Sequence, residues 1–371
     1  MRAAAPPTGV APAWAGVRRL LAVRLDNLGD VLMTTLALAA LRQAWPGVHL
    51  ALLASPAGAA LQPHLTDVDE VIPFEAPWVQ SACGAAEAGP AVQALVQRLA
   101  QGRFDAVVIF TVCTQSALPM AMVALQAGIG LRLAHCRENP YHLLTDWVRD
   151  AEVPGAGMRH EVQRQLDLLA AIGVRPPADE RLRLALRPGD AASLVQRLAR
   201  AGVDPSAPYF VVHPGASAAS RRYPAERFAQ AAQAVARGGG GRALVVGGAA
   251  EAALVQAAMP AGVPATALVG GLALGELAAL IAGATVTLCN NSGPAHIAAA
   301  LGAPVVVLYA LTNPQHTPWR APARVLSHDV PCRNCLRSVC PMGHHACLLG
   351  VPAEAVTEAA LGLMHAPMET T

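Results

Sequence analysis

Polar residues stand in the middle of a long uncharged run, in the segment LCNNSGPAHIAAALG (residues 288–302). They follow a strand-like stretch and lie at the start of a helix-like one: Asn291, Ser292, Gly293 and His296. The free amides of a helix N-terminus attract anions, a serine adds a hydroxyl, and a glycine lets the backbone approach a ligand closely. The pattern therefore fits an anion-binding loop. The alternative is that Asn291 or Ser292 only caps the helix and that His296 is a satisfied core histidine.

A second loop with similar chemistry is HPGASAASRRYPAERF (residues 213–228). Gly215 and Ser217 supply a flexible turn and a hydroxyl, and Arg221 and Arg222 precede an expected helix. The planar guanidinium of arginine matches two phosphate oxygens at once. The alternative is a solvated arginine pair at a helix entry. Two phosphate-competent loops in one domain favour a nucleotide diphosphate as the ligand.

A third loop, DNLGD (residues 26–30), contains a candidate general base. We expect Asp30 at the N-cap of the following helix, where an aspartate is common. An aspartate beside a cleft can also take the proton of an attacking hydroxyl. Asp26 is the next candidate if Asp30 is only a cap.

Alternating strands and helices must position these loops. The expected strands are 19–25, 48–54, 69–74, 104–110, 130–135, 209–215, 242–248, 265–270, 285–290 and 304–310. The expected helices are 30–45, 91–101, 158–174, 224–237, 275–283 and 294–301. This alternation predicts an α/β chain of two doubly wound, Rossmann-like domains that face a cleft. Ligands bind such sheets at the carboxyl ends of the strands.

The length of 371 residues also favours two domains. The Pro176–Pro177 pair marks the expected boundary. We predict a flexible tail at 1–17, a first Rossmann-like domain at 18–175, a second Rossmann-like domain at 176–330 and a Cys-rich segment with a C-terminal helix at 331–371.

Composition excludes several classes of protein. The formal charge is only +2, so no nucleic-acid partner is expected. The chain has no lysine, which removes Schiff-base and Walker A chemistry. It also has no G-x-G-x-x-G fingerprint, and no cofactor is expected. Its uncharged spans, 106–131 and 277–319, are interrupted by polar and turn residues, so a cytoplasmic protein without a membrane span is expected.

Four cysteines with the spacing C-x2-C-x4-C-x6-C lie near the end of the chain: Cys332, Cys335, Cys340 and Cys347. The first pair suits zinc, but the usual second C-x2-C is missing. We expect reduced thiols in a packing loop and no metal. A structural metal remains the alternative.

Four segments in order resemble glycosyltransferase family 9, the heptosyltransferases. RLDNLGDVLMTTLALAALRQAWPGVHLALLA is similar to the opening of these enzymes, and RHEVQRQLDLLAAIG to the helix that ends their first domain. VVHPGASAASRRYPAERFAQAAQAV resembles the start of their second domain, and NNSGPAHIAAALGAPVVVLY resembles their D-S/T-G-x-x-H donor loop. The Cys-rich tail is similar to those of the heptosyltransferase II type.

The resemblance implies a GT-B fold and an inverting, metal-independent transfer of heptose from ADP-heptose to a lipopolysaccharide inner-core acceptor. This acceptor is a lipid-linked saccharide at the inner face of the cytoplasmic membrane, so peripheral attachment there is expected. The resemblance also makes 18–175 the acceptor-side domain, with acceptor loops near residues 55–66 and 111–120, and 176–330 the nucleotide-sugar-binding domain. Asp30 matches the general base of the family, and Arg221 its diphosphate contact, which is usually lysine. Ser292, Gly293 and His296 match the donor loop. The remaining assignments are Asn291, where the family commonly has Asp, and Glu251, a candidate for the ribose hydroxyls.

Three alternatives stay open. One is an enzyme of the same family with another donor or acceptor. The second is a nucleotide-sugar epimerase of GT-B fold, which needs carboxylates around one sugar rather than an acceptor cleft. The third is a non-enzymatic metal- or redox-responsive binding protein centred on the Cys cluster.

Overall fold

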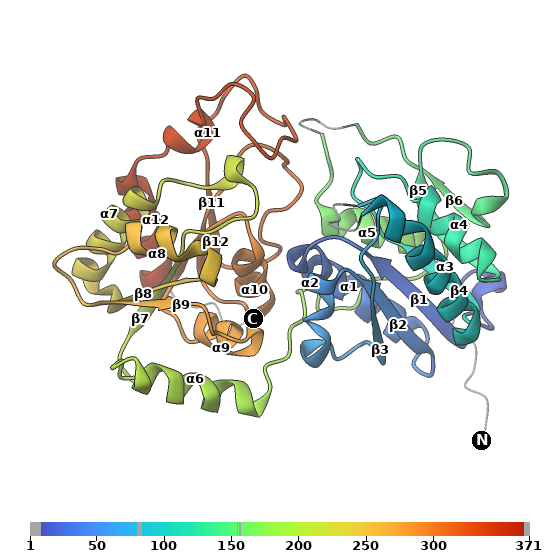
Figure 1. Cartoon of the computed structure of the whole chain (residues 1–371), viewed down its shortest axis with the longest axis horizontal. Helices are drawn as coiled ribbons and strands as arrows, with labels where there is room; N and C mark the ends of the chain where they lie inside the picture. Colours follow the sequence, from blue (N-terminus) through green and yellow to red (C-terminus); the bar gives the residue numbers. More distant parts are fainter. Residues whose placement is uncertain (1–8, 80–83, 154, 156, 367–371) are drawn as a thin grey trace. The chain divides into compact units, whose positions relative to one another are not determined.

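The computed structural model describes residues 9–79, 84–153, 155 and 157–366. The chain divides into two units, Met1–Arg183 and Leu184–Thr371, and each is built around a six-stranded sheet (Figure 1). All strand pairs in both sheets are parallel. This confirms the predicted α/β class with two doubly wound domains.

Unit 1 has the strand order β3-β2-β1-β4-β5-β6. Its strands are β1 Arg19–Arg24, β2 His49–Ala54, β3 Glu70–Pro73, β4 Ala106–Ile109, β5 Leu131–Cys136 and β6 Asp146–Arg149. Its helices are α1 Leu28–Ala44, α2 Pro56–Ala59, α3 Ala85–Gly102, α4 Leu118–Gln126 and α5 Glu161–Ala170. Strand order reverses between β1 and β4, which is where doubly wound sheets bind ligands.

Unit 2 repeats this topology with the order β12-β11-β10-β7-β8-β9. Its strands are β7 Tyr209–His213, β8 Arg242–Gly247, β9 Ala265–Val269, β10 Thr287–Asn290, β11 Val305–Leu308 and β12 Ala323–Leu326. Its helices are α6 Pro188–Arg200, α7 Ala225–Val235, α8 Ala252–Ala257, α9 Leu274–Ala282, α10 Gly293–Leu301, α11 Ala346–Leu349 and α12 Ala353–His365. The equivalent reversal point lies between β7 and β10.

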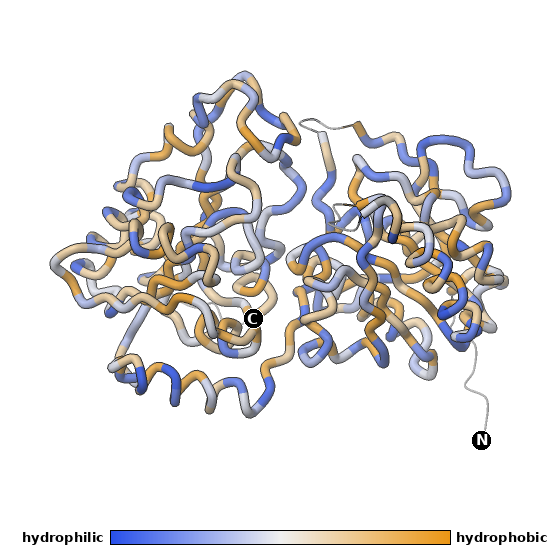
Figure 2. Tube along the Cα trace, viewed as in Figure 1, coloured by the Kyte–Doolittle hydropathy of each residue, from blue (hydrophilic) through white to orange (hydrophobic). Residues whose placement is uncertain are grey.

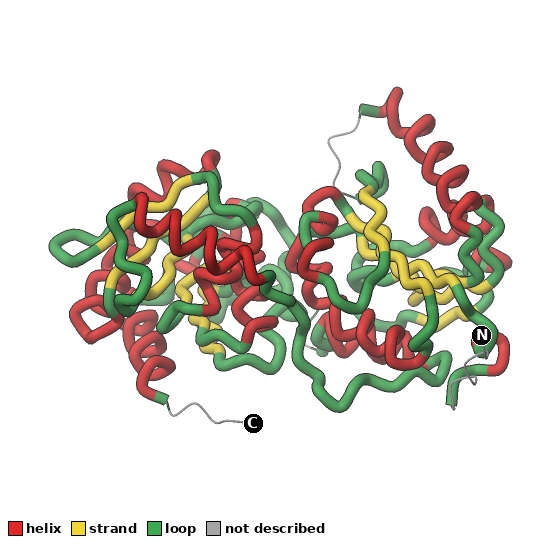
Figure 3. The backbone as a smooth tube through the Cα atoms, turned by 90° about the horizontal axis from the view of Figure 1, so that it is seen from below, coloured by secondary structure: helices red, strands yellow, loops and turns green. Residues whose placement is uncertain are grey.

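The central strands are buried because helices cover them. β4, β10 and β11 are buried at every residue. Hydrophobic colour follows the strands in Figure 2, and Figure 3 shows the helices of each unit packed around its sheet. A parallel sheet covered on both faces produces such continuous runs instead of alternating ones.

The described part of the predicted tail is packed rather than loose. Pro12–Trp14 form a 3₁₀ helix, and the Trp14 side chain is fully buried. Its carbonyl accepts a hydrogen bond from Trp45 Nε1 at 3.1 Å. Residues 1–8 lie outside the described residues. The burial of one large aromatic side chain anchors a segment that reads as Ala/Pro-rich linker.

The chain leaves unit 1 later than the Pro pair suggests. Leu182 is buried, and the Arg183 N–H donates to Thr35 Oγ1 at 2.9 Å. These contacts keep the residues after Pro177 on unit 1. Helix α6 and strand β12 were not expected, because one is mostly exposed and the other is half-exposed at the sheet edge.

None of the helices in the described part of the chain is long and apolar enough to cross a membrane.

Candidate active site

The two predicted donor loops of unit 2 meet at the carboxyl ends of β7 and β10, which are neighbours in the sheet. The buried side chain of Asn290 joins them. Its Oδ1 accepts a hydrogen bond from the Tyr223 N–H at 2.9 Å, and its Nδ2 donates to the Pro214 carbonyl at 2.8 Å. No sequence pattern predicted a role for this residue. An asparagine as the last residue of an apolar strand is the signal that could have identified it.

Arg221 supplies a positive charge at this junction. Arg221 forms no ion pair with a carboxylate of the described residues. Its Nε is buried and has no hydrogen-bond partner among them. Burial raises the pKa of the nearby Tyr309 hydroxyl, and the Arg221 charge and a hydrogen bond with the Asn291 side chain oppose that rise. Arg221 and Asn291, which come from different loops, therefore both act on the Tyr309 hydroxyl.

Arg222 has a different role. Its Nε donates to the Ala216 carbonyl at 2.8 Å, so the side chain holds its own loop in place. Ser217, in the same loop, is exposed. The two adjacent arginines are thus distinguished by their contacts: one stabilises the turn, and the other keeps a charge that a ligand can use.

The NNSG loop has the backbone expected for a helix entry. Ser292 is extended, with φ −153°, and α10 begins at Gly293 with Pro294 in its first turn. Ser292 Oγ donates to the Asn290 carbonyl at 3.2 Å, and Ser292 makes no side-chain cap. His296 is buried. The free amides at the start of α10 therefore remain suited to an anion.

Glu251 and Gly215 are in close contact, although they follow different strands. A Cβ atom on Gly215 would lie 1.8 Å from Glu251 Oε1, so a larger residue at this position would displace the Glu251 carboxylate. Glu251 Oε2 accepts the Gly248 N–H at 2.9 Å and lies 3.8 Å from His213 Nε2. Burial lowers the pKa of His213, with Glu251 acting in the opposite direction. Glu251, the candidate ribose contact, therefore lies at the same edge of the sheet as the candidate phosphate loop after β7.

In unit 1 the predicted base, Asp30, belongs to a buried charge cluster. Arg24 is fully buried and contacts Asp26 at 3.0 Å, Asp30 at 3.3 Å and Glu161 at 2.6 Å. Asn27, not Asp30, is the N-cap of α1, which corrects the expected position. Asp30 is the third residue of the helix, and its Oδ2 accepts the Asn27 N–H at 3.0 Å. It can hold this position because the helix starts two residues earlier than predicted.

Arg24 is shared by three carboxylates, Asp26, Asp30 and Glu161. The Arg164 charge also acts on Glu161. Burial raises the pKa values of Asp26 and Glu161, against the effect of Arg24. Burial alone would lower the pKa of Arg24, but the carboxylates raise it overall. A raised pKa makes a carboxylate a stronger proton acceptor.

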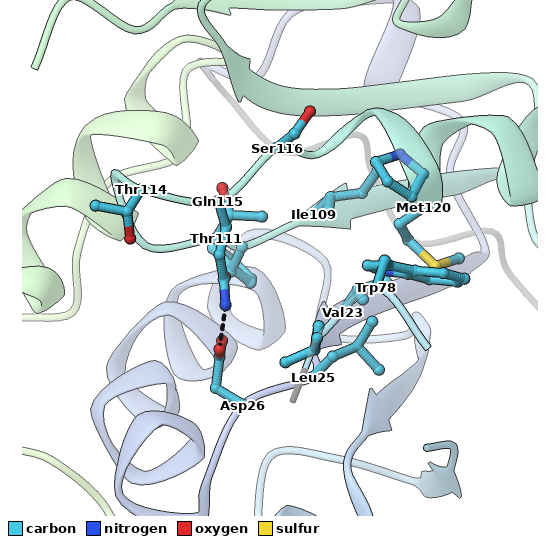
Figure 4. Close-up of a pocket in the computed structure, with 13 residues that line it drawn as sticks. Val23, Leu25, Asp26, Trp78, Ile109, Thr111, Thr114, Gln115, Ser116 and Met120 are labelled. Atoms are coloured by element: carbon cyan, nitrogen blue, oxygen red, sulfur yellow. Dashed lines mark hydrogen bonds between the residues drawn. The ribbon is translucent and has the colours of Figure 1, made fainter. Parts of the chain in front are cut away.

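A cavity of about 220 Å³ opens beside this cluster, at the carboxyl ends of β1 and β4 (Figure 4). Gln115 Nε2 donates to Asp26 Oδ1 across 2.5 Å at its wall. Trp78 and Met120 lie on the apolar side. Asp30 is not among the described residues that line the cavity. Gln115 falls in the predicted acceptor loop 111–120, whereas no sequence pattern singled out Trp78.

The Cys-rich segment contacts the loop that carries Arg221. Ser220 donates through its N–H to the Ser338 carbonyl at 3.0 Å and through Oγ to the Arg337 carbonyl at 2.7 Å. The four cysteines of the Cys-rich segment are free thiols, and Cys332 Sγ lies 3.9 Å from His344 Nε2. In the part of the chain that the structure describes, no three His, Cys, Asp or Glu side chains are arranged to hold a metal ion.

Comparison with known proteins identifies a family with this chain's sequence pattern. The sequence model of Glycosyltransferase family 9 (heptosyltransferase) matches residues 92–346. Lipopolysaccharide heptosyltransferase 1 of Pseudomonas aeruginosa is 29% identical over 324 residues, which is 87% of each chain.

Two solved structures share the fold. The glycosyl transferase family 9 protein from Veillonella parvula has a TM-score of 0.76 and 21% identity, covering 96% of this chain and 99% of its own. The E. coli ADP-heptose LPS heptosyltransferase II has a TM-score of 0.71 and 23% identity, covering 93% and 98%. The predicted GT-B fold is confirmed by these neighbours together with the two parallel sheets.

Proposed function

Because the chain belongs to glycosyltransferase family 9, the heptosyltransferases, and is therefore a glycosyltransferase, we propose that it transfers a heptose from ADP-heptose to a lipopolysaccharide inner-core acceptor. The names of its relatives support a heptose as the transferred sugar, ADP as the nucleotide of the donor and lipopolysaccharide as the source of the acceptor. The observation that carries the proposal is the Arg221 charge, which has no acidic partner among the described residues, at the reversal point of unit 2.

The diphosphate is proposed to bind between the two loops joined by Asn290. Arg221 pairs with phosphate oxygens, and the amides at Ser292 and Gly293 donate from the start of α10. The other proposed donor contacts are Gly215, Ser217, Asn291 and His296, with Glu251 at the ribose hydroxyls. This arrangement needs no metal, because the arginine and the helix terminus neutralise the charge that develops on the leaving ADP.

The proposed reaction is a single inverting displacement. The acceptor hydroxyl oxygen attacks the anomeric carbon of the heptose, and the bond from that carbon to the diphosphate oxygen breaks, so ADP leaves with the electron pair. Asp30 takes the hydroxyl proton as general base. Since the acceptor is lipid-linked, we place the reaction at the inner face of the cytoplasmic membrane, with the enzyme bound peripherally from the cytoplasm.

The test is ADP release from ADP-heptose with and without an inner-core acceptor. The proposal predicts release that depends on the acceptor. An epimerase would convert the sugar nucleotide without any acceptor, and a non-enzymatic binding protein would leave it intact. A matching titration of ADP, UDP and GDP examines the nucleotide separately, with ADP expected to bind most tightly.

A further inference from the structure

The cavity of unit 1 has an apolar side and a polar side. Its walls come from the ends of β1 and β4, the segment after β3 and the start of α4. Trp78 and Met120 lie on one side, and Asp26 with Gln115 lies opposite (Figure 4). At about 220 Å³ it is smaller than the roughly 300–1,000 Å³ typical of drug-sized ligands, so it suits one monosaccharide rather than a longer chain.

The charge of this cavity is negative. Among the described lining residues Asp26 is the one charged side chain. Arg24, its ion-pair partner, does not line the cavity and is shared with Asp30 and Glu161. A carboxylate or phosphate entering here would meet Asp26 without a described cation to pair with, and such like-charge contacts are strongly unfavourable.

Among the described residues of unit 1, the adjacent hollow does not supply a cation that lines the cavity. A second hollow shares Thr114, Gln115 and Ser116 with the cavity and includes Arg137. The Arg137 guanidinium donates to the carbonyls of Cys113 and Glu152. Its Nε is also 3.7 Å from Asp150 Oδ2. These contacts hold the Arg137 guanidinium against loops of its own unit, and Arg137 lines the second hollow but not the cavity.

We propose that this cavity seats the terminal sugar of the acceptor and that this sugar is uncharged and rich in hydroxyls, not an acidic sugar. The proposal rests on the glycosyl transfer proposed above. Trp78 offers an apolar surface to the C–H groups of a sugar ring, while Asp26 accepts from its hydroxyls and the second N–H of Gln115 can donate to them. The cavity thus selects the acceptor by charge.

The first experiment compares two inner-core saccharides, one ending in a neutral heptose and the other in a carboxylated keto-sugar. We expect kcat/KM to favour the neutral acceptor by at least about tenfold. Equal use of both, or preference for the acidic one, would overturn the proposal.

The second experiment uses variants and measures saccharide binding without any donor, through quenching of Trp78 fluorescence. Trp78→Phe serves as the signal control. Asp26→Asn should reduce the ratio of the affinities for the neutral and the acidic saccharide by at least about tenfold. Asp179→Asn, at an exposed position, should leave this ratio unchanged. Thr114→Arg, at an exposed lining position, should shift binding toward the acidic saccharide and does not depend on the buried cluster for folding.

Binding without donor keeps this inference separate from the proposed function. If transfer fails but the neutral saccharide still binds with the expected response to Asp26→Asn and Thr114→Arg, the acceptor assignment stands and the donor is wrong. If neither saccharide perturbs Trp78, or the variants leave the preference unchanged, the cavity is not the acceptor site.

Discussion

Gln115 donates to Asp26 across 2.5 Å and so joins the carboxyl ends of β4 and β1 in unit 1. Asn290 makes the corresponding connection in unit 2, between the end of β10 and the loop after β7. In both sheets a side-chain amide therefore links the two strands at the reversal point. Each link fixes a loop that carries a proposed substrate contact.

Asp30→Asn should lower turnover by about 100-fold or more, as expected when a general base is lost. ADP affinity should be unchanged, because the proposed donor contacts are in unit 2. A modest fall in melting temperature is also expected, since Asp30 contacts Arg24 and accepts the Asn27 N–H. Initial rates and ADP titrations measure both effects. Normal turnover would reduce Asp30 to a structural role and make Asp26 the next candidate.

Arg221→Ala should weaken ADP and ADP-heptose together by about 1.5–3 kcal/mol, the range for a charged hydrogen bond. Arg222→Ala is the matched control, because its Nε is bound to the Ala216 carbonyl. Calorimetric titration of both variants gives the comparison. Small and equal losses would mean that the pair is only a solvated helix entry.

Asn290→Ala should destabilise the protein by about 1–3 kcal/mol, because it leaves the Tyr223 N–H and the Pro214 carbonyl buried without their partner. ADP affinity should fall as well, since the two donor loops lose their connection. Ser206→Ala, which alters an exposed hydroxyl of the same unit, is the control. Stability loss with unchanged ADP affinity would show that the loops hold their positions without Asn290.

Glu161→Gln should flatten the pH dependence of stability. Burial raises the folded pKa of Glu161 above its ordinary 4.5, so the folded state keeps a proton that the unfolded chain releases. The contribution of the protonated Glu161 to the free energy of unfolding is therefore fully present below the unfolded pKa. It is lost as pH rises through the folded pKa. Melting temperatures of wild type and variant from about pH 4 to about pH 8 test this. Parallel curves would contradict it.

The fold was largely predictable because buried parallel strands leave continuous apolar runs. The places of the loops after β7 and β10 at the strand ends could also be predicted, while their binding of an anion stays a prediction based on glycine, serine and arginine. The Arg24–Glu161 ion pair could not be predicted from the sequence, because 137 residues separate the two side chains and only the fold brings them together. Trp78 had no periodic pattern around it, and the position of Asp30 depended on where α1 begins.

The most direct test of the central claim is the mass of the acceptor after incubation with ADP-heptose. The account predicts that an inner-core saccharide gains one heptose residue for each ADP released, with the gain strongly reduced in Arg221→Ala and Asp30→Asn. An acceptor of unchanged mass, with ADP-heptose intact or converted without acceptor, would contradict it.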